Sequence, residues 1–224
     1  MNETDPSGLN PIYDNKGNFL GTDDSGLQGN YIIMDAKIFV QGMSHKSAEE
    51  HSYTGKIETN VENAIAAHFQ NLASRPDYDG FISIWEGVKW AKDHPYALQN
   101  PSPDNTLYVD ASQLDFGSLS KSDFSGDGET KSINLFNKEN TRHSIKNRKL
   151  RSTVYALGVF HIKILNREKG TVQIVNDDAT KYDWNTGGTK DRNRAIHINN
   201  FIFGINPSKH GFNTFYYGVG ELNQ

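Results

Sequence analysis

The sequence contains no cysteine, which excludes disulfides, thiol nucleophiles and thiolate metal ligands. It also lacks a long apolar run, since no stretch approaches the roughly 20 residues that a membrane-spanning helix needs. The first residues, MNETDPSGLNP, are acidic and polar and do not resemble a signal peptide. We therefore expect no transmembrane segment and no signal peptide in this chain, so that its export would depend on other machinery.

A basic excess is missing too, because the net charge is -4 at pH 7 and the pI is about 6.0. Proteins that bind double-stranded nucleic acid normally carry such an excess, so we expect no general nucleic-acid binding. A nuclease with a local basic patch stays open, because residues 140–151 are rich in arginine, lysine and histidine. The P-loop, GxSxG, HExxH and GxGxxG motifs are all absent. The sequence therefore gives no support to the enzyme classes that these motifs identify.

Enough apolar material is present for a folded core, with 35% hydrophobic and 11% aromatic residues among 224. Strand-like and helix-like segments are segregated along the chain, which is typical of an α+β fold. We expect an antiparallel β-sheet in the C-terminal half and helices concentrated in the N-terminal half.

The predicted organisation has four parts. They are a polar tail at 1–11, an N-terminal α+β part at 12–117, a polar linker or long loop at 118–150, and a C-terminal β-rich part at 151–224 that carries the candidate site. One continuous domain over 12–224 is the alternative.

Two local patterns in the N-terminal half carry specific expectations. Ser83 and Glu86 form a capping box, which predicts a helix that ends before His94. Trp85 and Trp90 lie on that helix, and we favour core positions for both over a carbohydrate-binding platform.

Asp23 and Asp24 invite comparison with a calcium loop, but no glutamate closes a twelve-residue loop there. We therefore favour a turn role for these two residues.

The densest chemistry follows a predicted β-hairpin. Apolar runs at Val154–Leu165 and Thr171–Val175 flank a polar, glycine-containing turn at 166–170, so we expect one antiparallel hairpin over Thr153–Val175. Acidic, aromatic and cationic residues come directly after it: Asn176, Asp177, Asp178, Tyr182, Asp183, Trp184, Asn185, Asp191, Arg192, Arg194 and His197. This combination suits a hydrolytic or phosphate-handling site.

Several segments resemble the C-terminal effector domains of Rhs-type bacterial polymorphic toxins. They are Gly17–Gly29, Asp79–Phe81, Trp90–Pro95, Pro103–Asp110, Thr153–Gly158 and Asn176–Asn185. The resemblance implies a secreted toxin of interbacterial competition, delivered into a target cell by a secretion system. It also implies two partners, a cognate immunity protein and a parent secretion or Rhs-type carrier.

A shorter stretch is similar to the colicin M-type bacteriocins, which cleave the pyrophosphate link of lipid II. Those proteins carry an Asp-x-Tyr-Asp stretch after a hairpin, and Tyr182-Asp183 matches its end. Thr180 stands where the first aspartate belongs, and Asp191 stands where a histidine should precede Arg192. The likeness implies a hydrolase acting on an anionic, lipid-linked phosphodiester or pyrophosphate.

On this reading each residue has a role. The catalytic residues are Asp183, Tyr182, His197 and Arg192, with Arg194, Asn185 and Trp184 binding substrate. Asp178 and Asp183 would hold Mg²⁺, an ion that prefers carboxylate oxygens. A purely structural alternative has Asp183 and Asn185 capping a turn while Tyr182 and Trp184 pack.

The leading functional hypothesis is thus a toxin domain that hydrolyses a cell-envelope phosphodiester or pyrophosphate bond. Two alternatives remain, a carrier or adaptor module of a secretion system without enzymatic activity, and a nuclease effector.

Overall fold

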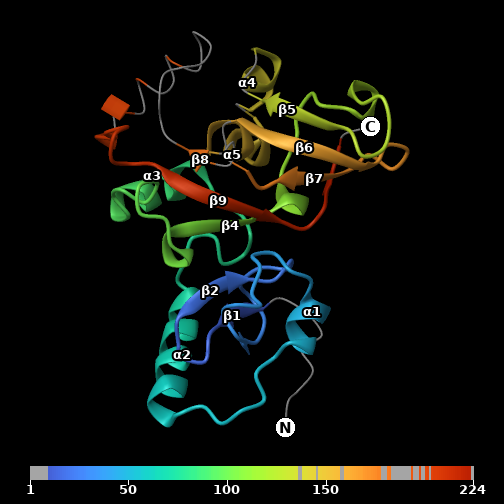
Figure 1. Cartoon of the computed structure of the whole chain (residues 1–224). Coiled ribbons are helices and arrows are strands. Elements are labelled where there is room, and N and C mark those ends of the chain that lie inside the picture. Colours follow the sequence, from blue (N-terminus) through green and yellow to red (C-terminus); the bar gives the residue numbers. More distant parts are fainter. Residues whose placement is uncertain are drawn as a thin grey trace. The chain divides into compact units, whose positions relative to one another are not determined.

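The structure, a computed structural model, describes residues 10–135, 138–144, 146–156, 159–177, 181–182, 193, 197, 200–201 and 203–222. The chain divides into two compact units, Met1–Gly80 and Phe81–Gln224, which we describe separately. Figure 1 shows helices and strands in both. The α+β class is confirmed, with antiparallel pairing in the C-terminal half and most helices in the N-terminal half.

The first unit is built on a small sheet with two helices beside it. Its elements are β1 (Pro11–Tyr13), β2 (Phe19–Thr22), β3 (Ile32–Ile33), α1 (His45–Glu50) and α2 (Thr59–Leu72). β1 pairs antiparallel with β2 and parallel with β3. Tyr13 lies opposite Phe19, with ring centroids 5.4 Å apart. Gly17 closes the turn between them at a φ of 90°, a conformation that glycine adopts without steric cost.

The second unit contains two sheets and several helices, whose bounds follow where the structure describes them. Its helices are α3 (Ile84–Asp93), η1 (Pro103–Asn105), η2 (Ala111–Gln113), η3 (Lys121–Asp123), α4 (Lys138–Ser144) and α5 (Arg148–Ala156). Its strands are β4 (Thr106–Asp110), β5 (Thr130–Asn134), β6 (Val159–Asn166), β7 (Thr171–Val175), β8 (Lys181–Tyr182), β9 (Phe212–Tyr217) and β10 (Gly220–Glu221).

One of these sheets is fully antiparallel, and the other is mixed. The antiparallel sheet has the order β10-β7-β6-β5. In the other, β9 lies between β4, which is parallel to it, and β8, which is antiparallel. Residues 118–150, expected as a linker or long loop, supply β5 to the antiparallel sheet and lie within the second unit.

The predicted hairpin is correct from β6 onwards and wrong at its start. β6 and β7 pair antiparallel around a turn at 167–170. Residues 153–156, however, complete helix α5 and do not begin a strand. The side chain of Asn147 accepts a hydrogen bond from the Leu150 amide at 3.0 Å, and Leu150 and Val154 are both buried. An N-terminal cap and an apolar pair four residues apart favour a helix here over the β-branched composition.

The two faces of β6 have opposite environments. Phe160, Ile162 and Ile164 are fully buried in the main core, and each contributes about 1.5–3 kcal/mol through burial. His161 and Lys163 point to the other face, because side chains alternate along a strand. The register that hides the isoleucines therefore also presents the imidazole of His161 outside the core.

Helix α3 begins as the sequence predicts. The Ser83 hydroxyl accepts from the Glu86 amide, and the Glu86 carboxylate accepts from the Ser83 amide at 2.8 Å. Trp90 is buried, as expected, but the prediction for Trp85 is wrong, because 62% of its surface is exposed. Helical spacing separates Trp85 and Trp90 by five residues, so they cannot share one face. Within the described part of the chain, no helix is long and apolar enough to cross a membrane.

Candidate functional site

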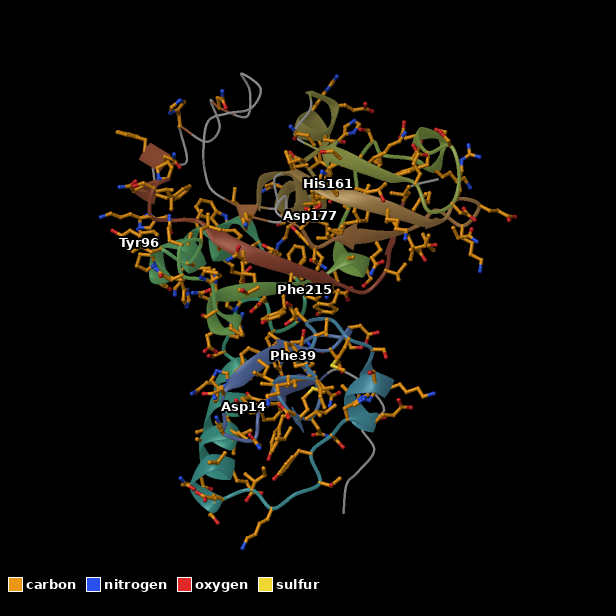
Figure 2. All side chains as sticks on the ribbon, in the orientation of Figure 1. Asp14, Phe39, Tyr96, His161, Asp177 and Phe215 are labelled. Carbon is orange, nitrogen blue, oxygen red and sulfur yellow. The ribbon has the colours of Figure 1, made fainter. Side chains whose placement is uncertain are left out.

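A histidine and an aspartate meet where the β6–β7 hairpin ends. The Nδ1 atom of His161 lies 2.5 Å from the Oδ2 atom of Asp177. An ionised carboxylate can only accept, so the imidazole N–H donates in this contact. The side chains are 38% and 35% exposed, respectively, and Figure 2 labels both on the second unit. A solvent-accessible imidazole that a carboxylate orients is an arrangement found in general acid–base sites.

The sheet register explains how these two residues come together. His161 of β6 pairs with Val175, the last residue of β7. Asp177 is only two residues after Val175, so its side chain lies close enough to contact His161. On its other side His161 is directly opposite Ser132 of β5. Paired residues of an antiparallel sheet project from the same face, with Cβ atoms about 4.5–5.5 Å apart. The exposed Ser132 is therefore an immediate neighbour of the imidazole.

Asn176 fixes the chain between the hairpin and Asp177. Its side-chain oxygen accepts from the Tyr216 amide at 2.7 Å, and its side-chain nitrogen donates to the Tyr216 carbonyl at 2.8 Å. These two bonds join the end of β7 to β9 as an additional backbone pairing would. Asn176 thus has a structural role that the sequence, which grouped it with the polar cluster, did not indicate.

Most of the sequence-predicted site residues lie outside the described residues. These are Asp178, Asp183, Trp184, Asn185, Arg192 and Arg194. The backbone of Tyr182 belongs to β8 and pairs with Phe212 of β9. His197 has helical backbone and an exposed side chain. The structure therefore describes strand β8, which leads into the predicted cluster. How the residues of that cluster are arranged relative to one another stays a prediction.

The predicted magnesium ligands, Asp178 and Asp183, are among those residues. Among the residues that the structure does describe, no group of three or more histidine, aspartate and glutamate side chains is placed to hold a metal ion. The role of Mg²⁺ consequently stays a prediction from the sequence.

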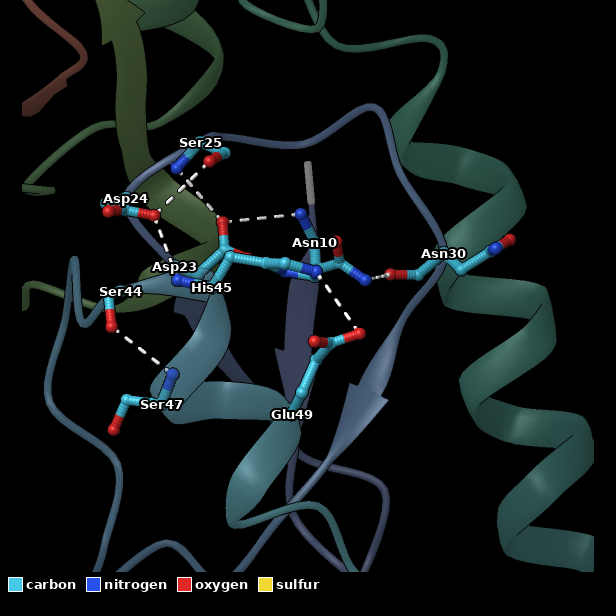
Figure 3. A network of polar contacts seen from close by, with 9 residues as sticks. All are labelled: Asn10, Asp23, Asp24, Ser25, Asn30, Ser44, His45, Ser47 and Glu49. Carbon is cyan, nitrogen blue, oxygen red and sulfur yellow. Dashed lines mark hydrogen bonds and ion pairs between the residues drawn. The ribbon is translucent and has the colours of Figure 1, made fainter. Parts of the chain in front are cut away.

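A second polar network lies in the first unit, around Asp23 (Figure 3). The fully buried Asp23 carboxylate accepts from the Asn10 amide at 3.3 Å and from the Ser25 amide at 3.0 Å. Its second oxygen lies 3.0 Å from Nδ1 of His45 on α1, whose Nε2 lies 3.4 Å from the Glu49 carboxylate. The Asp23–His45 pair thus ties the start of β1 and a turn to helix α1.

Burial raises the pKa of Asp23 to about 6, while the bonds from His45, Asn10 and Ser25 lower it and only partly compensate. The turn role expected for Asp23 and Asp24 holds, because Asp23 accepts from the amide of Ser25, two residues on. Asp24 accepts in addition from the His45 amide at 3.0 Å, so the pair also caps the approach to α1.

Sequence reasoning missed the pairing in both networks. Twenty-two residues separate Asp23 from His45, and sixteen separate His161 from Asp177. The only available signal for the second pair was that His161 occupies an outward position of a strand whose hairpin partner leads to Asp177. Fixing that pair would have required the register of the hairpin, which a one-residue slip reverses.

Comparison of the chain with protein-family models, with curated proteins and with solved structures found no match.

Proposed function

We propose that this chain is a toxin or effector domain that hydrolyses a phosphodiester or pyrophosphate bond of the bacterial cell envelope, with His161 as its general acid–base residue. The observation that supports it most is the 2.5 Å contact between His161 and Asp177. It lies where the described hairpin leads into the carboxylate- and arginine-rich segment. Delivery by a secretion system, a carrier and an immunity protein belong to the same proposal, through the resemblance to Rhs-type toxins.

The chemistry assigns a separate task to each member of the pair. Asp177 accepts from Nδ1–H and so leaves the lone pair on Nε2, which can take a proton from water. The water oxygen then bonds to phosphorus, and the bond from phosphorus to the leaving oxygen breaks. Nε2–H returns the proton to that leaving oxygen, so atoms and charges balance over one turnover. Partial exposure of the pair lets both water and substrate reach it.

The predicted cluster supplies what this pair lacks. Arg192 and Arg194 carry planar guanidinium groups that bind phosphate oxygens in a bidentate manner. Asp183, the predicted catalytic carboxylate, would orient water or an ion next to the phosphate. A lipid II-like pyrophosphate fits this set, because it presents two adjacent anionic groups to the two arginines.

A nuclease effector is the second candidate, and one observation favours it. Exposed basic side chains lie in the last turn of α4, in the connection and in the first turn of α5, namely Arg142, His143, Lys146, Arg148 and Lys149. Such a cluster attracts the phosphates of nucleic acid despite the acidic total charge.

Targeted expression separates the two candidates. We expect export of the chain to the periplasm of a test bacterium to stop growth, while the same amount of protein in the cytoplasm is harmless. Harm from the cytoplasmic form alone would favour the nuclease. Equal harm from both forms, or from neither, would contradict the envelope hydrolase.

A further inference from the structure

An exposed aromatic corner on the second unit is unexplained by the His161–Asp177 site. Trp85 of α3 is 62% exposed, and its ring meets that of Phe203 at an angle of 89° with centroids 4.9 Å apart. Neighbouring apolar side chains that stay exposed together, unlike single ones, are a feature of ligand-binding grooves. Two rings set at a right angle form a corner in which a planar ring can stack on one of them and abut the other.

The corner opens into a pocket of about 360 Å³, which is within the range of small-molecule sites. Besides the two rings, its lining includes Val88, Lys89, Lys92 and Asp93. Half of the lining residues are therefore charged, which is a poor match for a purely apolar ligand.

The charge at this pocket is positive. Lys89 is bound to Asp93, its neighbour one turn on, so those two charges compensate each other. Lys92 has no ion-pair partner among the described residues. Burial lowers the pKa of His210, and the nearby positive charges of Lys92 and Lys209 lower it further. The positive charge of Lys92 therefore acts on its surroundings and is not cancelled there.

A ligand that suits this pocket has a planar ring that stacks on Trp85 and an anionic group that binds Lys92. We propose that this pocket binds a nucleoside phosphate, with its base stacked on Trp85 against Phe203 and its phosphate held by Lys92. Base stacking on an aromatic side chain accepts any base, because every base has a π-face. An uncharged glycan would leave the cation without a partner, and inorganic phosphate would leave the ring corner empty.

The ligand has two sources with the same chemistry, a free nucleotide and a single-stranded nucleic acid. Calorimetric titration of the full chain with thymidine monophosphate, thymidine, inorganic phosphate and a short oligothymidylate distinguishes them. We expect the monophosphate to bind and both of its halves to bind at least tenfold more weakly. An oligothymidylate that binds far more tightly than the monophosphate assigns the site to nucleic acid, and equal affinities assign it to the free nucleotide.

Variants then locate the ligand. Trp85→Leu should weaken binding by about tenfold or more, in line with the loss of one stacked base. Lys92→Gln should weaken it several-fold and flatten its dependence on salt. The matched control is Lys169→Gln, another exposed lysine, in the β6–β7 turn, and this variant should bind like the wild type.

This inference does not rest on the proposed hydrolase. A His161→Asn variant should therefore bind the nucleotide as the wild type does, whatever its hydrolytic activity. Absence of nucleotide binding at millimolar concentration would overturn the inference. So would binding that survives Trp85→Leu unchanged, or binding of an uncharged chitooligosaccharide in preference to the nucleotide.

Discussion

The Nδ1 atom of His161 and the Oδ2 atom of Asp177 are 2.5 Å apart, although His161 lies in β6 and Asp177 follows the end of β7. The contact depends on the register of β6 against β7, which the buried isoleucines on the opposite face of β6 fix. Core packing thus determines where an ionisable pair lies on the other face of the same sheet.

The first prediction concerns Ser132, the cross-strand neighbour of His161. If water is the nucleophile, Ser132→Ala should keep hydrolysis within about threefold of the wild type, because the alanine removes only a hydroxyl from an exposed position. Steady-state hydrolysis of a pyrophosphate substrate measures this. A loss as large as that of a His161 variant would instead make Ser132 the nucleophile and contradict direct attack by water.

The second prediction concerns Asp183, which lies outside the described residues and is assigned from the sequence. Asp183→Asn keeps the side-chain shape and removes the charge, so hydrolysis should fall by about a hundredfold or more. If Asp183 has no structural role, the melting temperature should change little, since substitutions away from the core, helix caps and buried networks usually stay within about 0.5 kcal/mol. Both quantities should be measured on one preparation. A variant with lower stability and intact activity would show that Asp183 only caps a turn.

The third prediction tests Asn176 as a structural link. Asn176→Ala removes both bonds to the Tyr216 backbone and should lower the free energy of unfolding by about 1–3 kcal/mol. Urea denaturation followed by circular dichroism gives this value. Gln173→Ala, at an exposed position of β7, is the control and should change stability by less than about 0.5 kcal/mol. Equal effects from the two variants would argue against the link.

The fourth prediction is a pH dependence that comes from Asp23. Its folded pKa of about 6 exceeds the ordinary value of 3.8, so the folded state binds this proton more tightly than the unfolded state. The resulting stabilisation is complete below the ordinary value and is lost as the pH rises through about 6. A difference of this size corresponds to about 3 kcal/mol at most, because each unit is worth about 1.4 kcal/mol.

Asp23→Asn isolates that contribution, since the amide oxygen can still accept from the Asn10 and Ser25 amides while His45 and Glu49 remain in both proteins. Urea unfolding between about pH 7 and pH 4 should show the wild type gaining stability relative to the variant as the pH falls. Parallel pH profiles for the two proteins would be inconsistent with the raised pKa.

Local signals in the sequence were sufficient for parts of this fold. The Ser83–Glu86 capping box and the turn at 167–170 both depend on residues close in the chain. The start of α5 was misassigned because β-branched residues at 153–154 suggested a strand, while the Asn147 cap and the buried Leu150 favoured a helix.

The sites depend on contacts between distant residues, which composition does not specify. Both histidines that pair with carboxylates, His45 and His161, find them through tertiary structure. Trp85 was expected in the core because tryptophan is usually buried, yet its position on α3 places it opposite Trp90.

The most direct test of the central claim is hydrolysis of a lipid-linked pyrophosphate by purified wild-type protein, His161→Asn and Asp177→Asn, with phosphate-containing products quantified. We expect the wild type to release product and His161→Asn to lose about 10²–10⁴-fold in rate, as removal of a general acid–base group does. Asp177→Asn should also lose activity while both variants keep the wild-type melting temperature to within a few degrees. Full activity in a folded His161→Asn variant would contradict the account.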